Sequence, residues 1–256
     1  QLFYLGRPLS EVIPALESAY QFGLRFRKGA FLSSLQAKSL SALKRQILAL
    51  QGHTERPTSL TDHTFDEDAF VQTLREPAEQ HEYYVNKLPL LYLFGEYEEA
   101  YEITLQGSNI ADAYMGLFQE PEYYFYTSLV LTALFPNVSP SQQRKFRKAL
   151  RANQKRLRNW AHYAPSNFAA KNHLLEAEVA RIENRPLDAI ESFEKIANQE
   201  QAMKHAYAQA IKHAELARDI NSNDDDVLVS LALYYAKTHD EINARKALAL
   251  LKNKEL

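Results

Sequence analysis

Hydrophobic residues recur along this chain at steps of three and four positions, the period of an amphipathic helix. Two segments show the stripe clearly: Val12, Ile13, Leu16, Ala19 and Tyr20 in the first, and Leu174, Leu175, Ala177, Val179 and Ile182 in the second. No stretch sustains the period-two alternation of a half-buried strand, so we expect no β-sheet. The pattern predicts an all-α protein.

Start and stop signals divide the chain into about twelve predicted helices. At the clearest start, Ser139 is the expected N-cap, Pro140 takes the first helical position and Gln142 closes a capping box. Residues 64–67 have the same Ser/Thr-x-x-Glu form. The predicted spans are 10–23, 25–50, 66–76, 78–94, 96–107, 111–119, 121–134, 141–162, 167–183, 186–199, 201–220 and 225–251.

One junction recurs between predicted helices: a turn residue, a short polar step and then a small residue. It runs from Gly95 to Ala100 and from Asn184 to Ala189, begins again at Gly6, and returns weakly at 238–245. The small residue lets two antiparallel helices approach closely, and the Gly or Asn is expected to form the left-handed cap of the first helix. This is a tetratricopeptide-type hairpin.

The spacing of these junctions predicts an irregular stack. Positions 6, 95 and 184 are evenly separated, but the interval is not a multiple of the roughly 34 residues of a regular tetratricopeptide repeat. We therefore expect an all-α, irregular tetratricopeptide-like α-solenoid of antiparallel helices, with additional helices between the repeats. Residues 1–256 are predicted to form a single helical-repeat domain, with a loop or hinge at 51–65, where Gly52 and Pro57 interrupt the pattern.

Composition excludes several classes of function. Cysteine is absent, which rules out a disulfide framework, a thiolate metal site and a Cys nucleophile. None of the eight histidines lies in an H-E-x-x-H motif, and His205 with His213 is too weak a pair to indicate a metal site. There is no P-loop, kinase or nucleophile-elbow motif. We expect no catalytic residue, cofactor or metal.

The same features indicate a cytoplasmic protein without membrane contact. No apolar run approaches the roughly 20 residues of a membrane-spanning helix, and no signal peptide is visible. The formal net charge of −2 provides no global field that would attract nucleic acid or a membrane surface. The expected partner is therefore a protein.

Two features are candidates for binding that partner. Tyrosines crowd the middle third of the chain; most are expected to fill the core, but a tyrosine-lined wall is the alternative. The run 144–158 holds eight cations and no acid, which indicates either a solvated face or a patch for an acidic protein or nucleotide domain, with nucleic acid not expected. The candidate partner-binding residues are Tyr92, Tyr97, Tyr123, Tyr124, Tyr126, Arg147, Arg151, Lys155 and Arg158.

Long stretches of the chain, at 124–136, 147–161, 164–168 and 174–181, carry a family resemblance. They resemble the helical-repeat region of large bacterial multi-sensor signalling kinases, in which a STAND-class, AAA-type ATPase precedes the repeats and sensor and kinase domains follow. Some members also carry a serine/threonine kinase domain ahead of the ATPase. The resemblance covers most of the chain and is weakest at 199–226.

The resemblance implies a non-catalytic scaffold or sensor region that mediates protein–protein interaction. In signal transduction, such a region would regulate an attached ATPase or kinase module. A stand-alone adaptor that holds a peptide or helix in a concave groove is the alternative. An all-α enzyme whose active site leaves no motif is the third and least favoured interpretation.

Overall fold

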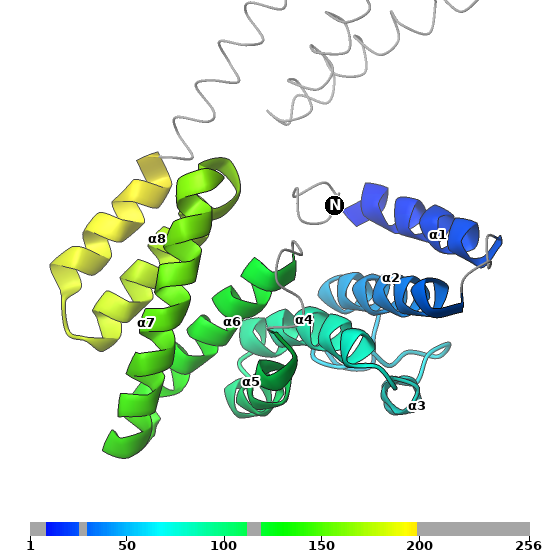
Figure 1. Cartoon of the computed structure of the whole chain (residues 1–256), viewed down its shortest axis with the longest axis horizontal. Helices are drawn as coiled ribbons and strands as arrows, with labels where there is room; N and C mark the ends of the chain where they lie inside the picture. Colours follow the sequence, from blue (N-terminus) through cyan, green and yellow to red (C-terminus); the bar gives the residue numbers. More distant parts are fainter. Residues whose placement is uncertain (1–8, 26–29, 112–118, 199–256) are drawn as a thin grey trace, which may run out of the picture. The chain divides into compact units, whose positions relative to one another are not determined.

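The computed structural model describes residues 9–25, 30–111 and 119–198, and these ranges are mainly helical (Figure 1). The elements are α1 (Leu9–Arg25), α2 (Ala30–Leu50), α3 (Glu67–Gln72), α4 (Pro77–Leu93), α5 (Tyr97–Ala111), α6 (Gln119–Leu134), the 3-10 helix η2 (Phe135–Asn137), α7 (Pro140–Tyr163) and α8 (Pro165–Ile182). No strand forms in these ranges. They contain an isolated β-bridge between Asp62 and Phe65. The predicted all-α class is confirmed.

The number of helices differs from the expected twelve. The described ranges contain eight α-helices and one 3-10 helix with defined bounds, and residues 186–198 are also helical. The helices expected at 201–220 and 225–251 lie outside the described residues, as does most of 111–119. Within the described part of the chain, no helix combines the length and the apolar character needed to cross a bilayer.

The chain divides into two compact units, Gln1–Ala189 and Ile190–Leu256. The first unit contains all the elements named above. In the second unit, residues 190–198 are described, and they are helical. The single domain 1–256 stays a prediction.

Helices of the first unit pack mainly against their neighbours in the chain (Figure 1). α5 packs against α4 and α6, and α7 packs against α6 and α8. In addition, α4 contacts α6 and α6 contacts α8, while α2 packs on α1 and α4. The contacts of α4 with α5 and α6, and of α6 with α7 and α8, are the arrangement that lets helical hairpins bury a continuous core.

Two hairpin junctions have the predicted backbone geometry. Gly95 and Asn184 are left-handed, with φ of 84° and 56°. At the Gly95 turn the amide of Glu96 donates to the carbonyl of Leu91 at 2.9 Å, and the amide of Gly95 donates to the carbonyl of Tyr92 at 3.2 Å. This pair of hydrogen bonds is a Schellman motif.

The same motif closes two other helices. At Asn184, the amide of Arg185 donates to the carbonyl of Ala180 at 2.9 Å. At the end of α2, Gly52 has φ of 75° and the amide of His53 donates to the carbonyl of Leu48. The junction expected at Gly6 lies outside the described residues.

The main core lies among α4, α5, α6, α7 and α8. Ala100 has no exposed surface, as expected for the small residue after a hairpin turn. Around it are buried Val85, Leu88, Leu91, Ile103, Tyr123, Tyr124, Phe125, Leu129, Val130, Leu131, Leu134, Phe135, Phe146, Leu150, Leu157, Leu175 and Val179. A smaller cluster of Ala49, Leu60, Leu74, Tyr83 and Leu90 lies where the loop after α2 meets α4.

Two predicted helix starts differ in detail from the structure. Ser139 is the N-cap of α7 and accepts from the amide of Gln142, but the side chain of Gln142 donates to the Tyr101 hydroxyl at 2.7 Å and does not close a capping box. In the 64–67 segment the N-cap is Asp66, which accepts from Ala69 at 2.8 Å. The predicted N-cap of α7, Ser139, is confirmed. In the 64–67 segment the motif identified the turn correctly and the capping residue wrongly.

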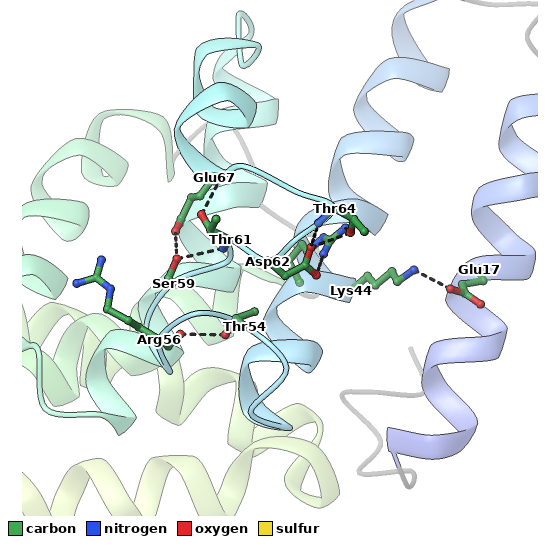
Figure 2. A network of polar contacts seen from close by, with 10 residues as sticks. Glu17, Lys44, Thr54, Arg56, Ser59, Thr61, Asp62, Thr64 and Glu67 are labelled. Carbon is green, nitrogen blue, oxygen red and sulfur yellow. Dashed lines mark hydrogen bonds and ion pairs between the residues drawn. The ribbon is translucent and has the colours of Figure 1, made fainter.

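The loop between α2 and α3 is held by polar contacts along its length (Figure 2). The carboxylate of Glu67 accepts from the amide of Leu60 at 2.9 Å and from Lys87 at 2.8 Å, and Lys87 also donates to the carbonyl of Thr58. Asp62 accepts from the amide and the hydroxyl of Thr64 and pairs with an arginine of α2. That this loop acts as a hinge stays a prediction.

Candidate partner-binding surface

Three predicted tyrosines, from three successive helices, meet on the first unit. Tyr92 lies near the end of α4, Tyr97 begins α5 and Tyr126 lies in the middle of α6. The Tyr92 ring centroid is 5.7 Å from that of Tyr97 and 6.0 Å from that of Tyr126. All three side chains are half-buried and pack against the main core. We call these three residues the tyrosine cluster.

The hairpin turn explains half of this arrangement. Because Gly95 reverses the chain within a few residues, the last turn of α4 and the first turn of α5 lie side by side, which brings Tyr92 and Tyr97 together. Tyr126 completes the cluster through the contact between α4 and α6. Burial raises the pKa of Tyr126 to about 12, and charge interactions with Glu122 and with the Tyr92 hydroxyl add to the increase, so the Tyr126 hydroxyl stays protonated at neutral pH.

A charged pair from α8 lies beside the cluster. Arg181 donates to the Glu178 carboxylate at 2.8 Å and to the carbonyl of Thr132 on α6 at 3.3 Å. Burial raises the pKa of Tyr92, Glu178 adds to that increase, and Arg181 opposes it. The guanidinium is half-exposed, so the cluster has an apolar centre and a polar edge.

Tyr123 and Tyr124 belong to the core, and the prediction that they face a partner is wrong. Their exposed fractions are 2% and 8%. The Tyr123 hydroxyl donates to the carbonyl of Thr104 at 2.8 Å, and burial raises its pKa well above the usual value. Tyr124 lies between the Tyr123 ring and Trp160, with Arg156 stacked over its face. Consecutive tyrosines cannot be sorted by spacing alone, because a helix buried on most sides accepts all of them.

The predicted basic residues lie on α7. Arg151, Lys155 and Arg158 are exposed, whereas Arg147 is half-buried and its guanidinium lies 4.8 Å from the centroid of the Phe135 ring. These cations are not part of the tyrosine cluster, whose members come from α4, α5 and α6. The predicted site is therefore two separate surfaces.

Sequence reasoning missed a set of buried acids that join the helices. Glu79 pairs with Lys38 of α2 at 2.7 Å, Glu120 pairs with Arg156 of α7 at 3.8 Å, and Glu122 pairs with Lys171 of α8. Each acid lies in the first turn of α4 or α6, where the helix dipole favours negative charge. In the sequence they look like ordinary N-terminal acids, and only the partner helix shows that they fix the stacking.

A further buried acid, Glu82, joins three helices. Ser39 of α2 donates to its carboxylate at 2.8 Å, and the Gln119 amide of α6 donates at 3.1 Å. Burial raises the pKa of Glu82, although both hydrogen bonds oppose that increase. The acid is thus bound into the helix stack. Among the described side chains, no three His, Cys, Asp or Glu residues gather as a metal ion would require.

Antiparallel helix pairs closed by left-handed caps, stacked on one shared core, define a tetratricopeptide-type helical-repeat protein. The family described as CHK1-like, TPR repeats matches residues 57–223, more than half of the chain, and the chain belongs to this family. No curated protein and no solved structure matches the chain. Tetratricopeptide repeats generally mediate protein–protein interaction and are typically non-catalytic.

Proposed function

We propose that this chain is a non-catalytic scaffold that binds a partner polypeptide through the tyrosine cluster. The observation that carries the proposal is the meeting of Tyr92, Tyr97 and Tyr126 from three successive helices, with the pair of Arg181 and Glu178 at the edge. Half-buried tyrosines supply a large, rigid contact area and freeze few rotamers on binding, and each keeps a polar hydroxyl. A polar rim around an apolar centre is the usual anatomy of a binding surface.

The family resemblance indicates where the partner comes from. We infer that the partner is an ATPase or kinase module of the same signalling protein, and that the chain regulates this module. A ligand that contacts the end of α4, the start of α5 and the middle of α6 would fix the angles between these helices. Because small changes in angle add up along a stack of repeats, such a contact can bias a distant module. Couplings of this kind are typically worth about 1 to 3 kcal/mol.

A stand-alone adaptor is the second candidate function. The same cluster would then hold a peptide or helix of another protein. The two candidates are distinguished by the gene: contiguous ATPase and kinase domains support the first, whereas a gene limited to this chain supports the second.

Binding to the attached module tests the proposal. The chain is titrated with the ATPase or kinase module encoded beside it, as wild type and as the double variant Tyr92→Ala with Tyr97→Ala. We expect the dissociation constant of the double variant to rise by at least about tenfold, equivalent to about 1.4 kcal/mol. The matched control is Tyr163→Ala, since that ring is 78% exposed at the end of α7.

Two results would contradict the proposal. One is equal affinity for wild type and the double variant, and the other is an equal loss in the Tyr163→Ala control. Thermal unfolding of each variant shows whether the half-buried rings are also needed for stability. Arg181→Ala provides a second test at the edge of the cluster, because that side chain is half-exposed and its removal leaves the core intact.

A further inference from the structure

Five basic residues form one straight stripe along the solvent side of α7. They are Arg144, Lys148, Arg151, Lys155 and Arg158, and all five are exposed. Their spacing alternates between four and three residues, which keeps every side chain within about 40° of a common line on a helix of 3.6 residues per turn. At about 1.5 Å per residue the stripe is about 21 Å long. We call these five residues the basic stripe.

The face of α7 opposite to the basic stripe packs into the core, so the stripe faces the solvent. Phe146, Leu150 and Leu157 are buried with exposed fractions of 3%, 1% and 0%, and they point to the far side of α7. Of the other three cations in 144–158, Arg156 lies over Tyr124 and Arg147 lies over Phe135.

The charge of the stripe is not balanced by the rest of the described structure. No Asp or Glu occurs between Pro140 and Tyr163. Within the described ranges, none of the five cations forms an ion pair or a hydrogen bond through its side chain, although several arginines and lysines elsewhere in these ranges do. A row of uncompensated like charges raises the free energy of the folded chain through repulsion, and a complementary anionic surface lowers it.

We propose that the basic stripe binds an acidic α-helix of a partner protein, whose carboxylates recur at the same alternation of three and four residues. Such a helix can place one carboxylate opposite each cation along the full length of the stripe, because both rows follow the period of an α-helix. The inference rests on the proposed role as a partner-binding scaffold. It uses a different surface from the tyrosine cluster and does not depend on the ATPase or kinase identity of the partner.

The shape of the stripe favours this occupant over nucleic acid. The exposed positions contain no aromatic side chain between the cations on which bases could stack. The chain as a whole carries a formal net charge of −2, so it lacks the general positive field of a nucleic-acid-binding protein. Exposed ion pairs are weak singly and are screened by salt, so the expected complex forms quickly and weakens as ionic strength rises.

A designed peptide tests the proposal on the full chain. The probe is an alanine-based helical peptide with glutamates at positions matching the stripe, and its control has the same composition with the glutamates redistributed around the helix. We expect the matched peptide to bind at least about fivefold more tightly than the redistributed one at 50 mM salt. We also expect Lys148→Gln with Arg151→Gln and Lys155→Gln to weaken the matched peptide at least about tenfold.

A charge-matched variant separates the stripe from net charge. Arg56→Gln with Arg75→Gln and Lys145→Gln removes the same charge from exposed positions off the stripe, and we expect less than a twofold change. Equal weakening in both triple variants, or equal affinity for the two peptides, overturns the proposal. If the chain binds a duplex DNA more tightly than the matched peptide, and the triple variant of the basic stripe loses that binding, the proposal is overturned and the surface is assigned to nucleic acid. The double variant Tyr92→Ala with Tyr97→Ala keeps the basic stripe, so we expect it to bind the matched peptide like wild type. The peptide titration and the module titration can therefore contradict one proposal without contradicting the other.

Discussion

The ring of Tyr123 on α6 lies directly against the backbone of Gly107 on α5. A Cβ atom at Gly107 would lie 2.8 Å from both Cε2 and the hydroxyl oxygen of Tyr123, closer than side-chain carbons approach one another. The ring cannot swing away freely, because its hydroxyl donates to the carbonyl of Thr104 at 2.8 Å and its surroundings are packed. The contact between α5 and α6 is therefore set to a distance that only glycine permits.

Gly107→Ala is expected to destabilise the protein. In a free helix the change would stabilise by about 1 kcal/mol, because alanine is the better helix former. Here the added methyl group forces either the ring or α5 to move, and overpacking of this kind typically costs about 1 to 3 kcal/mol. Chemical denaturation should show a lower free energy of unfolding for Gly107→Ala.

A double-mutant cycle identifies the cause. In the background of Tyr123→Leu the ring is absent, and Gly107→Ala should become neutral or stabilising. If the substitution costs the same free energy in both backgrounds, the contact with Tyr123 is not the reason for the glycine.

Lys87→Met is expected to be strongly destabilising, because it leaves the carboxylate of Glu67 buried without its cation. The two side chains are 6% and 10% exposed and are joined at 2.8 Å, and Tyr83 also donates to the carboxylate. Removing one partner of a buried ion pair typically costs about 3 to 5 kcal/mol. Lys87 also binds the carbonyl of Thr58, so hydrogen exchange of the amides at 58–62 should accelerate in the variant.

An exposed pair provides the matched control. Lys195 and Glu191 form an ion pair at 2.8 Å, and their side chains are 48% and 64% exposed. Lys195→Met should change the free energy of unfolding by less than about 0.5 kcal/mol. The double variant Glu67→Gln with Lys87→Met should recover part of the loss, since no buried charge remains. A loss as small as that of the control would show that the pair does not hold the loop.

The helices and their turns were predictable because they depend on local chemistry. Hydrophobic spacing gave α7 within a residue of its observed bounds, and the junctions at Gly95 and Asn184 were recognised because a left-handed cap requires glycine or asparagine. The N-cap at Asp66 was missed, because Thr64 and Asp66 are both suitable capping residues and only the backbone direction selects one.

The candidate site was predictable only in part, because it depends on which helices meet. Tyr92, Tyr97, Tyr123 and Tyr126 are the same residue type at similar spacing, yet Tyr123 is enclosed by α5 while the others remain half-exposed. The acids that join the helices, such as Glu82, are equally invisible in the sequence, since a buried carboxylate is recognised by its partners. The basic stripe could be derived from spacing, but its lack of ionic partners could not.

Two substitutions test the left-handed caps in opposite directions. Gly95→Ala should destabilise by about 1 kcal/mol, because a residue with a Cβ is strained at φ of 84°. Asn184→Gly should be neutral or stabilising by up to about 1 kcal/mol, because glycine relieves the strain at φ of 56° and keeps the Schellman motif. Thermal unfolding checks both. A stabilising Gly95→Ala would contradict the role of the cap.

His81 should make the protein sensitive to mild acid. Its side chain is 1% exposed, and its ring centroid lies 5.6 Å from that of Tyr123. Burial lowers its pKa from the usual 6.5 to about 4, because the charged imidazolium loses its hydration in the core. The folded state therefore keeps His81 neutral at a pH where the unfolded chain already protonates it.

The direction of the pH effect follows from this difference. Well above pH 6.5, His81 is neutral in both the folded and the unfolded state, and it does not reduce the free energy of unfolding. As the pH falls from 6.5 to about 4, the unfolded state binds a proton at His81 that the folded state does not bind. The resulting loss approaches about 3 kcal/mol at pH 4. His81→Phe keeps an aromatic ring beside Tyr123 and should flatten the dependence of the unfolding free energy on pH in this range. His162→Phe, at an exposed position, should not. If wild type and His81→Phe lose stability equally between pH 6.5 and 4, the acid sensitivity lies in other groups, and His81 is not buried in its neutral form.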